Sequence, residues 1–215
     1  MKLTDTLAFV LQENGVGHVF GLQGGAVVHM FDSIERNGIG VTYTHHEESA
    51  ALAAVAFAKV TENLGCAIVT TGPGATNAIT GLLAAWQDSI PCLFISGQVR
   101  AQHTSYRRKV RQVGTQEVNI CDIVKPITKY CKFIQDKNSF VDELRHALSI
   151  ARSGRPGPVW LDLPLDMQWE DVEFAEKVPV IRSKAPPPQD HQGFVSALQL
   201  LQGAERPLLV LGYGI

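Results

Sequence analysis

The sequence predicts an α/β fold, with a parallel sheet flanked by helices on both faces, from three observations. Short apolar runs alternate with segments long enough to form helices, as in strand–helix–strand crossovers. Most of the runs are continuously apolar, as expected for strands covered on both sides. Glycine-containing turns follow two of the runs, at residues 21–25 and 72–74, and ligands of parallel sheets gather at such strand ends.

The first half of the chain supplies four of the predicted strands. Leucines and a valine at helical spacing predict an opening helix, with Thr4 as its cap and Gly15 as its stop. Apolar runs then predict strands at residues 18–20, 41–43, 67–70 and 92–96. The segments between them predict helices at residues 25–37, 47–62 and 75–86.

The second half begins with a polar loop at residues 97–114. Further elements are predicted as a short helix at 117–124, a strand at 129–134, a helix at 139–151 and a strand at 158–163. Residues 1–178 are therefore expected to form one domain.

Residues 179–190 are rich in proline and predict a stiff linker. A helix at 191–201 and a strand at 207–211 follow, and they predict the first helix and strand of a second α/β domain spanning 191–215. A strand at the end of a chain has no neighbour to pair with. The chain is therefore expected to be a fragment, truncated inside this domain.

The composition argues against several classes of protein. The formal net charge is −2 over 215 residues, so no overall attraction to nucleic acid or an anionic membrane is expected. No apolar run reaches about 18 residues and no signal peptide is recognisable, so neither a membrane span nor secretion is expected. The four cysteines form no C-x-x-C pair and fit a reducing cytoplasm.

Glu47 is the candidate for acid–base chemistry. It lies where a predicted strand gives way to an alanine-rich helix, and the Gly72-Pro73-Gly74 turn follows the next strand. A carboxylate there can relay a proton to a bound heterocycle, and a glycine turn lets the ring approach the backbone. Glu47 could instead only complement the helix dipole, a role that Glu48 could also fill.

Two other interpretations of these motifs are weaker. His45 and His46 are adjacent, so on a helix they would point about 100° apart, unlike the shared face of H-E-x-x-H zinc sites. No metal site is therefore predicted. The turn at Gly72 lacks the third glycine and the ribose-binding acid of a dinucleotide site.

Six blocks of sequence resemble, in order, the acetohydroxyacid (acetolactate) synthase branch of thiamine-diphosphate enzymes. They are GLQGGA at 21–26, HEESAA at 46–51, TGPGATN at 71–77, DSIP with ISGQ at 88–98, IVKPITK at 123–129 and GRPGPV at 154–159. The resemblance covers residues 1 to about 168 and implies the domain that binds the aminopyrimidine ring of thiamine diphosphate. In that family the matching Glu, here Glu47, hydrogen-bonds N1′ of the ring. It favours the imino tautomer, which takes the proton from the thiazolium C2.

The resemblance implies roles for other residues as well. The expected cofactor-binding residues, besides Glu47, are Gly72, Pro73, Gly74, Asn77, Gly24 and Gly25. The expected substrate-side residues are Gln23, His46 and Gln116. Arg155 matches a position that contacts FAD in flavin-carrying members, so FAD is a second expected ligand, and a plain turn is the alternative.

The chain departs from the family at substrate-facing positions. Thr115 precedes Gln116 where the family carries Phe, and Gln23 stands in place of Pro. The polar loop is longer than in those synthases and carries six basic side chains: Arg100, His103, Arg107, Arg108, Lys109 and Arg111. The loop is either a solvated basic segment or a recognition site for an anionic substrate or nucleotide.

The predicted function is that of one domain of a thiamine-diphosphate-dependent lyase or transferase, which decarboxylates a 2-oxo acid and carries out a carboligation. The Mg²⁺ ligands are expected in a domain absent from this chain, because no Gly-Asp-Gly motif occurs, and the fragment alone is expected to be inactive. The alternatives are a flavin-dependent oxidase of the pyruvate oxidase kind and a non-catalytic domain that keeps the fold. The resemblance implies a homodimer or homotetramer. The alanine-rich helix at 47–62 is apolar nearly all round, so it is expected at a two-fold interface or where another domain docks.

Overall fold

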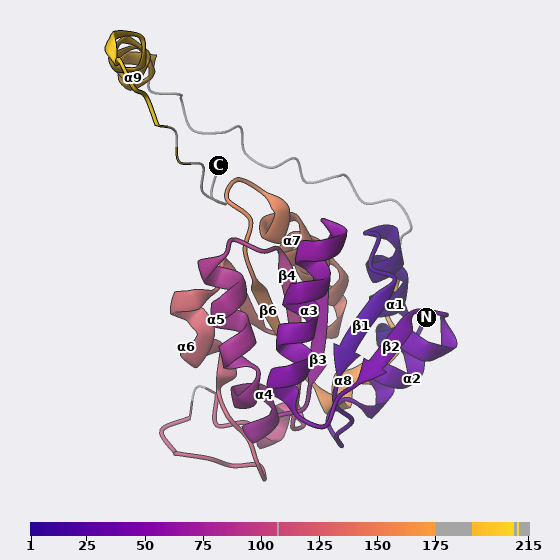
Figure 1. The fold of residues 1–215 in the computed structure, drawn as a ribbon. Helices are drawn as coiled ribbons and strands as arrows, with labels where there is room; N and C mark the ends of the chain where they lie inside the picture. Colours follow the sequence, from indigo (N-terminus) through magenta and orange to yellow (C-terminus); the bar gives the residue numbers. More distant parts are fainter. Residues whose placement is uncertain (107, 175–190, 209, 211–215) are drawn as a thin grey trace.

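The strands form one six-stranded parallel sheet in the order β2-β1-β3-β4-β6-β5 (Figure 1). The computed structural model describes residues 1–106, 108–174, 191–208 and 210. The strands are β1 (His18–Gly21), β2 (Gly40–Tyr43), β3 (Gly65–Val69), β4 (Cys92–Gln98), β5 (Tyr130–Phe133) and β6 (Val159–Pro164). The predicted α/β class with a parallel sheet is confirmed.

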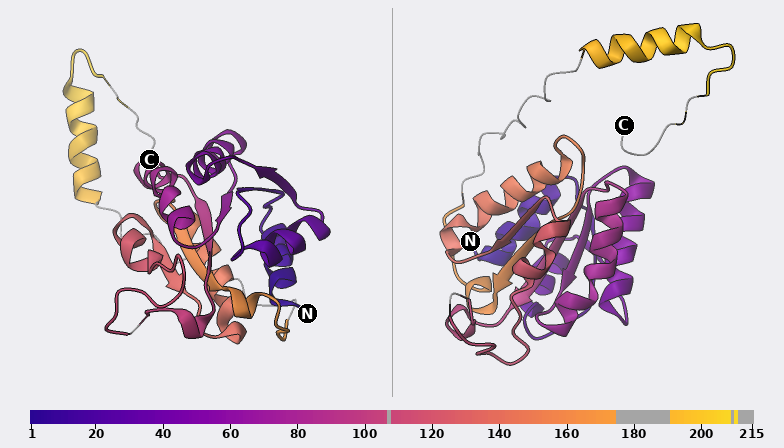
Figure 2. Two further views of the ribbon diagram at one scale, coloured as in Figure 1. Left: turned by 90° about the horizontal axis from the view of Figure 1, so that it is seen from below. Right: turned by 90° about the vertical axis from the view of Figure 1, so that its left-hand side faces the viewer.

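Helices cover both faces of the sheet (Figure 2). One face is covered by α1 (Leu3–Glu13), α2 (Val28–Arg36) and α7 (Phe140–Arg152). The other is covered by α3 (Glu47–Thr61), α5 (Ile79–Gln87) and α6 (Ile120–Val124). All of these helices except α1, which precedes β1, lie in the crossovers that parallel strands require.

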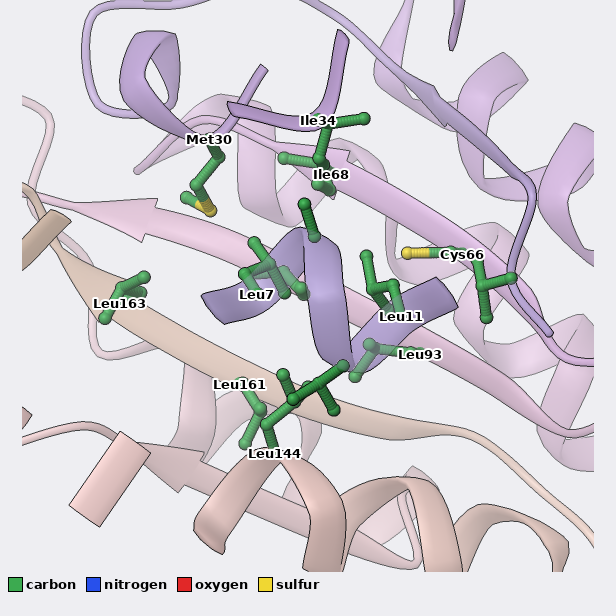
Figure 3. Packing of buried hydrophobic residues seen from close by; sticks show 14 of the residues in the cluster. Leu7, Leu11, Met30, Ile34, Cys66, Ile68, Leu93, Leu144, Leu161 and Leu163 are labelled. Carbon is green, nitrogen blue, oxygen red and sulfur yellow. The ribbon is translucent and has the colours of Figure 1, made fainter. Parts of the chain in front are cut away.

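Each face of the sheet has its own apolar core, because successive strand residues point to opposite sides. On one side Ile68, Leu93 and Leu161 pack around Leu7 and Leu11 of α1 (Figure 3). On the other side the rings of Phe94 and Trp160 stack with centroids 5.4 Å apart, beneath the alanines of α3. Burial on both faces explains why most strand sequences are continuously apolar.

Five local features differ from the sequence expectations. The predicted helix at 75–86 is two helices, α4 (Pro73–Asn77) and α5, which meet at Ala78. The predicted helix at 25–37 begins only at Val28, and that at 117–124 only at Ile120. Strand β4 continues through Gly97 and Gln98 into the predicted loop. A short helix, α8 (Leu165–Gln168), was not predicted.

The C-terminal part contains the predicted helix, α9 (His191–Gly203), whose apolar side chains Phe194 and Leu200 are 66% and 76% exposed. The predicted linker at 179–190 lies outside the described residues. Pro207, Leu208 and Val210 are not in a strand, contrary to expectation, and Leu209 and Leu211 lie outside the described residues. Within the part of the chain that the structure describes, no helix has the length and apolar character needed to cross a bilayer.

Candidate functional site

The candidate site lies at the edge of the sheet where the parallel strands end (Figure 1). Glu47 follows β2 and begins α3, Gly72 follows β3, and Gln98 is the last residue of β4. Because the strands run in the same direction, their carboxyl ends bring these three positions to a single edge.

Glu47 is a nearly buried carboxylate, with 9% of its surface exposed. Asn77 of α4 donates a hydrogen bond from Nδ2 to Oε2 of Glu47, at 3.0 Å. The other carboxylate oxygen, Oε1, lies beside Gly74, where an added Cβ would come within 3.2 Å of it. Glu47 is therefore anchored through Oε2, and its Oε1 faces the glycine turn.

His46, one of the predicted substrate-side residues, caps α3. Its Nδ1 accepts a hydrogen bond from the backbone N–H of Glu48 at 3.2 Å, and the side chain is exposed. A capping side chain satisfies one of the free N–H groups at the helix start.

The turn at Gly72 has a backbone conformation that only glycine adopts readily, with φ 65° and ψ −126°. A Cβ on Gly72 would lie 2.1 Å from the carbonyl oxygen of Gln116, whose own φ is 60°. Pro73 then starts α4 at a position that suits its fixed φ. The turn therefore packs directly against residue 116, which brings Gln116 to the same edge as Glu47.

Thr70 joins the two glycine turns and was not predicted as a site residue. A Cβ on Gly74 would lie 2.6 Å from Cγ2 of Thr70, and a Cβ on Gly24 would lie 2.6 Å from its Cβ. Gly25, by contrast, has open space around it. Gln23 is exposed and donates to the hydroxyl of Tyr43 at 2.7 Å, beside the end of β2.

A buried polar network lies next to this edge, and it was not predicted from the sequence. Asp162 of β6 accepts hydrogen bonds from Ser96 at 2.6 Å and from Gln98 at 3.0 Å. Burial raises the pKa of Asp162 to about 7, the charge of Glu117 adds to the effect, and these two hydrogen bonds oppose it. The only sequence signal was an aspartate inside an apolar strand.

The basic loop is tied to the same edge by Glu117. The carboxylate of Glu117 accepts hydrogen bonds from the backbone N–H and hydroxyl of Ser105 and, at 2.8 Å, from the N–H of Val113. Burial would raise the pKa of Glu117, but these hydrogen bonds outweigh it and lower the pKa below its usual value. An ionised Glu117 thus joins the two stems of the loop next to Gln116.

Arg155 is not brought together with the other predicted residues. It precedes β6 and donates from Nε to the hydroxyl of Ser89, which precedes β4, at 2.6 Å. Arg155 therefore lies at the amino ends of the strands, the edge opposite Glu47. There it lines a cavity of about 490 Å³ with Lys59, Asn63 and Pro156.

The described residues at the carboxyl edge fit one part of a thiamine cofactor. An aromatic nitrogen heterocycle needs a carboxylate partner and a backbone it can approach closely, and Glu47 beside Gly72 and Gly74 supplies both. Within the described ranges, no group of three or more histidine, cysteine or acidic side chains is placed to hold a metal ion.

Comparison with known proteins identifies the family of the chain. Residues 1–123 match the family described as thiamine pyrophosphate enzyme, N-terminal TPP binding domain. The acetolactate synthase large subunit of Haemophilus influenzae is 36% identical over 209 residues, which is 95% of this chain and 35% of that protein. The isozyme 2 large subunit of Escherichia coli is 35% identical over 208 residues, again 95% of this chain and 36% of that protein.

A probable acetolactate synthase large subunit of Methanocaldococcus jannaschii is 32% identical over 221 residues, covering 100% of this chain and 36% of that protein. The chain thus spans about a third of the length of these relatives. The family match covers more than half of the chain and includes Glu47, Asn77 and the Gly72 turn. The chain therefore belongs to the thiamine pyrophosphate enzymes and contains their N-terminal cofactor-binding domain.

Proposed function

We propose that this chain binds the aminopyrimidine ring for an enzyme that decarboxylates a 2-oxo acid and joins the product to a carbonyl acceptor. The observation that carries the proposal is the nearly buried Glu47, held by Asn77 beside the Gly72–Gly74 turn. The printed names of the relatives, acetolactate synthases, support a reaction of this class.

Each residue of the site has a defined task in this proposal. Thiamine diphosphate, when bound, supplies the carbon nucleophile and the electron sink for decarboxylation. Glu47 holds a ring nitrogen and exchanges a proton with it, while Asn77 keeps the carboxylate oriented. Burial of Glu47 excludes water and strengthens the hydrogen bond to the ring. The absence of side chains at Gly72 and Gly74 lets the ring lie close to the backbone.

The positive charges of the basic loop favour a substrate that is an anion. Five of its six basic side chains lie in the described residues, and all five are exposed: Arg100, His103, Arg108, Lys109 and Arg111. A 2-oxo acid carries a carboxylate, and a cluster of positive charge at the entrance raises its local concentration. The two stems of the loop, at Ser105 and Val113, are hydrogen-bonded to Glu117. The positive charge of the loop therefore lies at the edge of the sheet that holds Glu47.

The direct test uses the full-length protein with thiamine diphosphate and Mg²⁺, which we propose is bound by another domain. Pyruvate and 2-oxobutyrate are supplied, and carbon dioxide and the ligated product are measured. Release of carbon dioxide with formation of a new carbon–carbon bond is expected. Consumption of oxygen, together with flavin absorbance, would favour the oxidase alternative. Arg155, the residue predicted to contact FAD, lies at the opposite edge of the sheet from Glu47. No turnover of any 2-oxo acid would favour a non-catalytic domain.

The isolated chain is expected to bind thiamine diphosphate poorly and to have no carboligase activity. It supplies groups for the ring, whereas the diphosphate and its Mg²⁺ need hard oxygen ligands. Isothermal titration with cofactor and Mg²⁺ is the measurement. Micromolar binding by this 215-residue chain would contradict the division of the site between domains.

The full-length enzyme is proposed to be a cytoplasmic homodimer or homotetramer that associates through α3. Leu52 and Val60 lie eight residues apart on the outer side of this helix and are 40% and 83% exposed. Residues at i, i+4 and i+8 share one face, so Ala56 completes a small apolar stripe.

Changing both Leu52 and Val60 to Glu is expected to lower the sedimentation coefficient to that of a monomer. Ile123→Glu on α6 is the control, and a wild-type enzyme that is monomeric and fully active would refute the proposal.

A further inference from the structure

A chain of hydrogen bonds runs from Asp162 to the turn at Gly72. Asp162 accepts from Nε2 of Gln98, and Oε1 of Gln98 accepts from the hydroxyl of Thr71 at 2.8 Å. Thr71 is the residue immediately before Gly72. Asp162, Gln98 and Thr71 are all buried, with 2%, 2% and 6% of their surfaces exposed.

The orientation of the Gln98 amide is fixed by backbone groups. Its Nε2 donates to the carbonyl of Val118 at 2.8 Å, and its Oε1 accepts from the N–H of Val99 at 2.9 Å. A carbonyl can only accept and a backbone N–H can only donate, so the amide cannot be reversed. The oxygen of Asp162 that faces Nε2 must therefore act as an acceptor.

The other oxygen of Asp162 meets Ser96 of β4. The indole N–H of Trp160 donates to Oγ of Ser96 at 2.8 Å, which leaves the Ser96 hydroxyl proton to donate to Asp162. An ionised Asp162 satisfies every donor of this network. A protonated Asp162 would leave the Ser96 hydroxyl without its acceptor, and the bond from Gln98 would remain but be weaker, because a neutral carboxyl is a poorer acceptor than a carboxylate.

Gln98 also connects the two segments that form the turn. It holds Thr71 on one side and Val118 on the other, and between these contacts the carbonyl of Gln116 packs on Gly72. A shift of Gln98 would therefore move both segments of this contact, the turn at Gly72 and residues 116–118. With an added Cβ only 2.1 Å from that carbonyl, the turn at Gly72 has little room to adjust.

We propose that Asp162 is a positioning residue of the cofactor site, which holds Gln98 and thereby fixes the Gly72 turn against residues 116–118. The inference rests on the proposed function in one respect, which is that the cofactor ring is taken as the group that binds at this turn. Asp162 touches no reacting group; it acts through Gln98 and Thr71.

The proposal also links the site to pH. The titratable groups that interact electrostatically with Asp162 are Glu117 at the loop stem and Cys121 of α6. Cys131 of β5 is hydrogen-bonded to Cys121, and the ring of Tyr106 packs on Phe133, the strand neighbour of Asp162. The hydrogen bond with Cys131, together with burial, raises the pKa of Cys121, so this thiol stays neutral. Glu117 is ionised, and the pKa of Asp162, near 7, places its own charge change close to neutral pH.

Two measurements on the full-length protein test the proposal. The first is hydrogen–deuterium exchange of residues 70–78 and 114–118, which needs no cofactor. The second is the dissociation constant of thiamine diphosphate with Mg²⁺. Asp162→Ala and Thr71→Val are each expected to speed exchange in both segments and to weaken cofactor binding about tenfold, as for the loss of one hydrogen bond of ordinary strength.

The double variant distinguishes transmission through Gln98 from separate local damage. If Asp162 acts through Gln98 on Thr71, the two changes together weaken binding by about as much as the larger single change, instead of about a hundredfold. Asp162→Asn can still accept from Gln98, so it is expected to restore most of the affinity. It should also abolish the change in affinity and exchange rate that the wild type shows across about pH 7.

Asp142→Ala, an exposed change on α7, is the matched control and should leave both measurements unchanged. Should Asp162→Ala fail to fold, Thr71→Val and the pH profile of Asp162→Asn decide the question. Additive effects, unchanged exchange at residues 70–78, or a pH dependence that survives in Asp162→Asn would overturn the proposal. A wild-type protein that binds no thiamine diphosphate would refute the proposed function instead, and the exchange data would still decide the role of Asp162.

Discussion

Changing Glu47→Gln in the full-length enzyme is expected to lower turnover by about 10²–10⁴-fold, the range for a positioned acid–base group. Glutamine keeps the size of the side chain, and its carbonyl oxygen can still accept the hydrogen bond from Asn77. It cannot take up a proton from a ring nitrogen. The turnover number should therefore fall while the fold remains, as checked by steady-state kinetics and by thermal unfolding.

Glu48→Gln is the matched control for this prediction. Residue 48 points about 100° away around α3, and its backbone N–H, which is unaffected by the change, makes the contact with His46. Either glutamate adds at most about 1 kcal/mol through the helix dipole, so both variants should fold. Equal losses of activity in the two variants, or near wild-type turnover by Glu47→Gln, would show that Glu47 is not the acid–base group.

The overall fold could be predicted because each element carries a local signal. The apolar runs and the helical spacing of Leu3, Leu7 and Leu11 report burial directly. The break at Ala78 carries no such signal, because alanine is the best helix former, and the preceding Asn77 makes its hydrogen bond with Glu47, thirty residues away in the sequence. The extension of β4 to Gln98 was missed for a similar reason, since its stabilising partners Asp162 and Val118 are distant in sequence.

The candidate site was predicted in part. Glu47 and the Gly72 turn stand out because a carboxylate and glycines at strand ends have a chemical meaning of their own. The hydrogen bond from Asn77 to Glu47 and the packing of Gln116 on Gly72 agree with the predicted grouping, although their roles stay predictions. Thr70, Gln98 and Asp162 were missed because their importance depends on contacts between strands, which one sequence does not show. Arg155 was placed by motif alone, and a motif does not reveal which edge of the sheet it joins.

Asp162 is expected to make the stability of the protein fall as pH rises toward neutrality. Its pKa is about 7 in the folded chain and near 3.8 in the unfolded chain. Between these values the folded state holds a proton that the unfolded state has released, so the free energy of unfolding decreases with rising pH and levels off above about pH 7. At 1.36 kcal/mol for each pKa unit, the full loss is on the order of 4 kcal/mol.

Asp162→Asn removes this titration and should flatten the profile. Urea unfolding of the wild type and the variant at several values between about pH 5 and pH 8 gives the difference in unfolding free energy at each pH. The lowered pKa of His29, caused mainly by burial, has the opposite slope in this range, but it is common to both proteins and cancels in the difference. Asp142→Asn, whose side chain is exposed, should run parallel to the wild type. The free energy of unfolding of Asp162→Asn should therefore rise relative to that of the wild type as the pH increases. A difference that stays constant with pH would mean that Asp162 ionises at its ordinary pKa despite its burial.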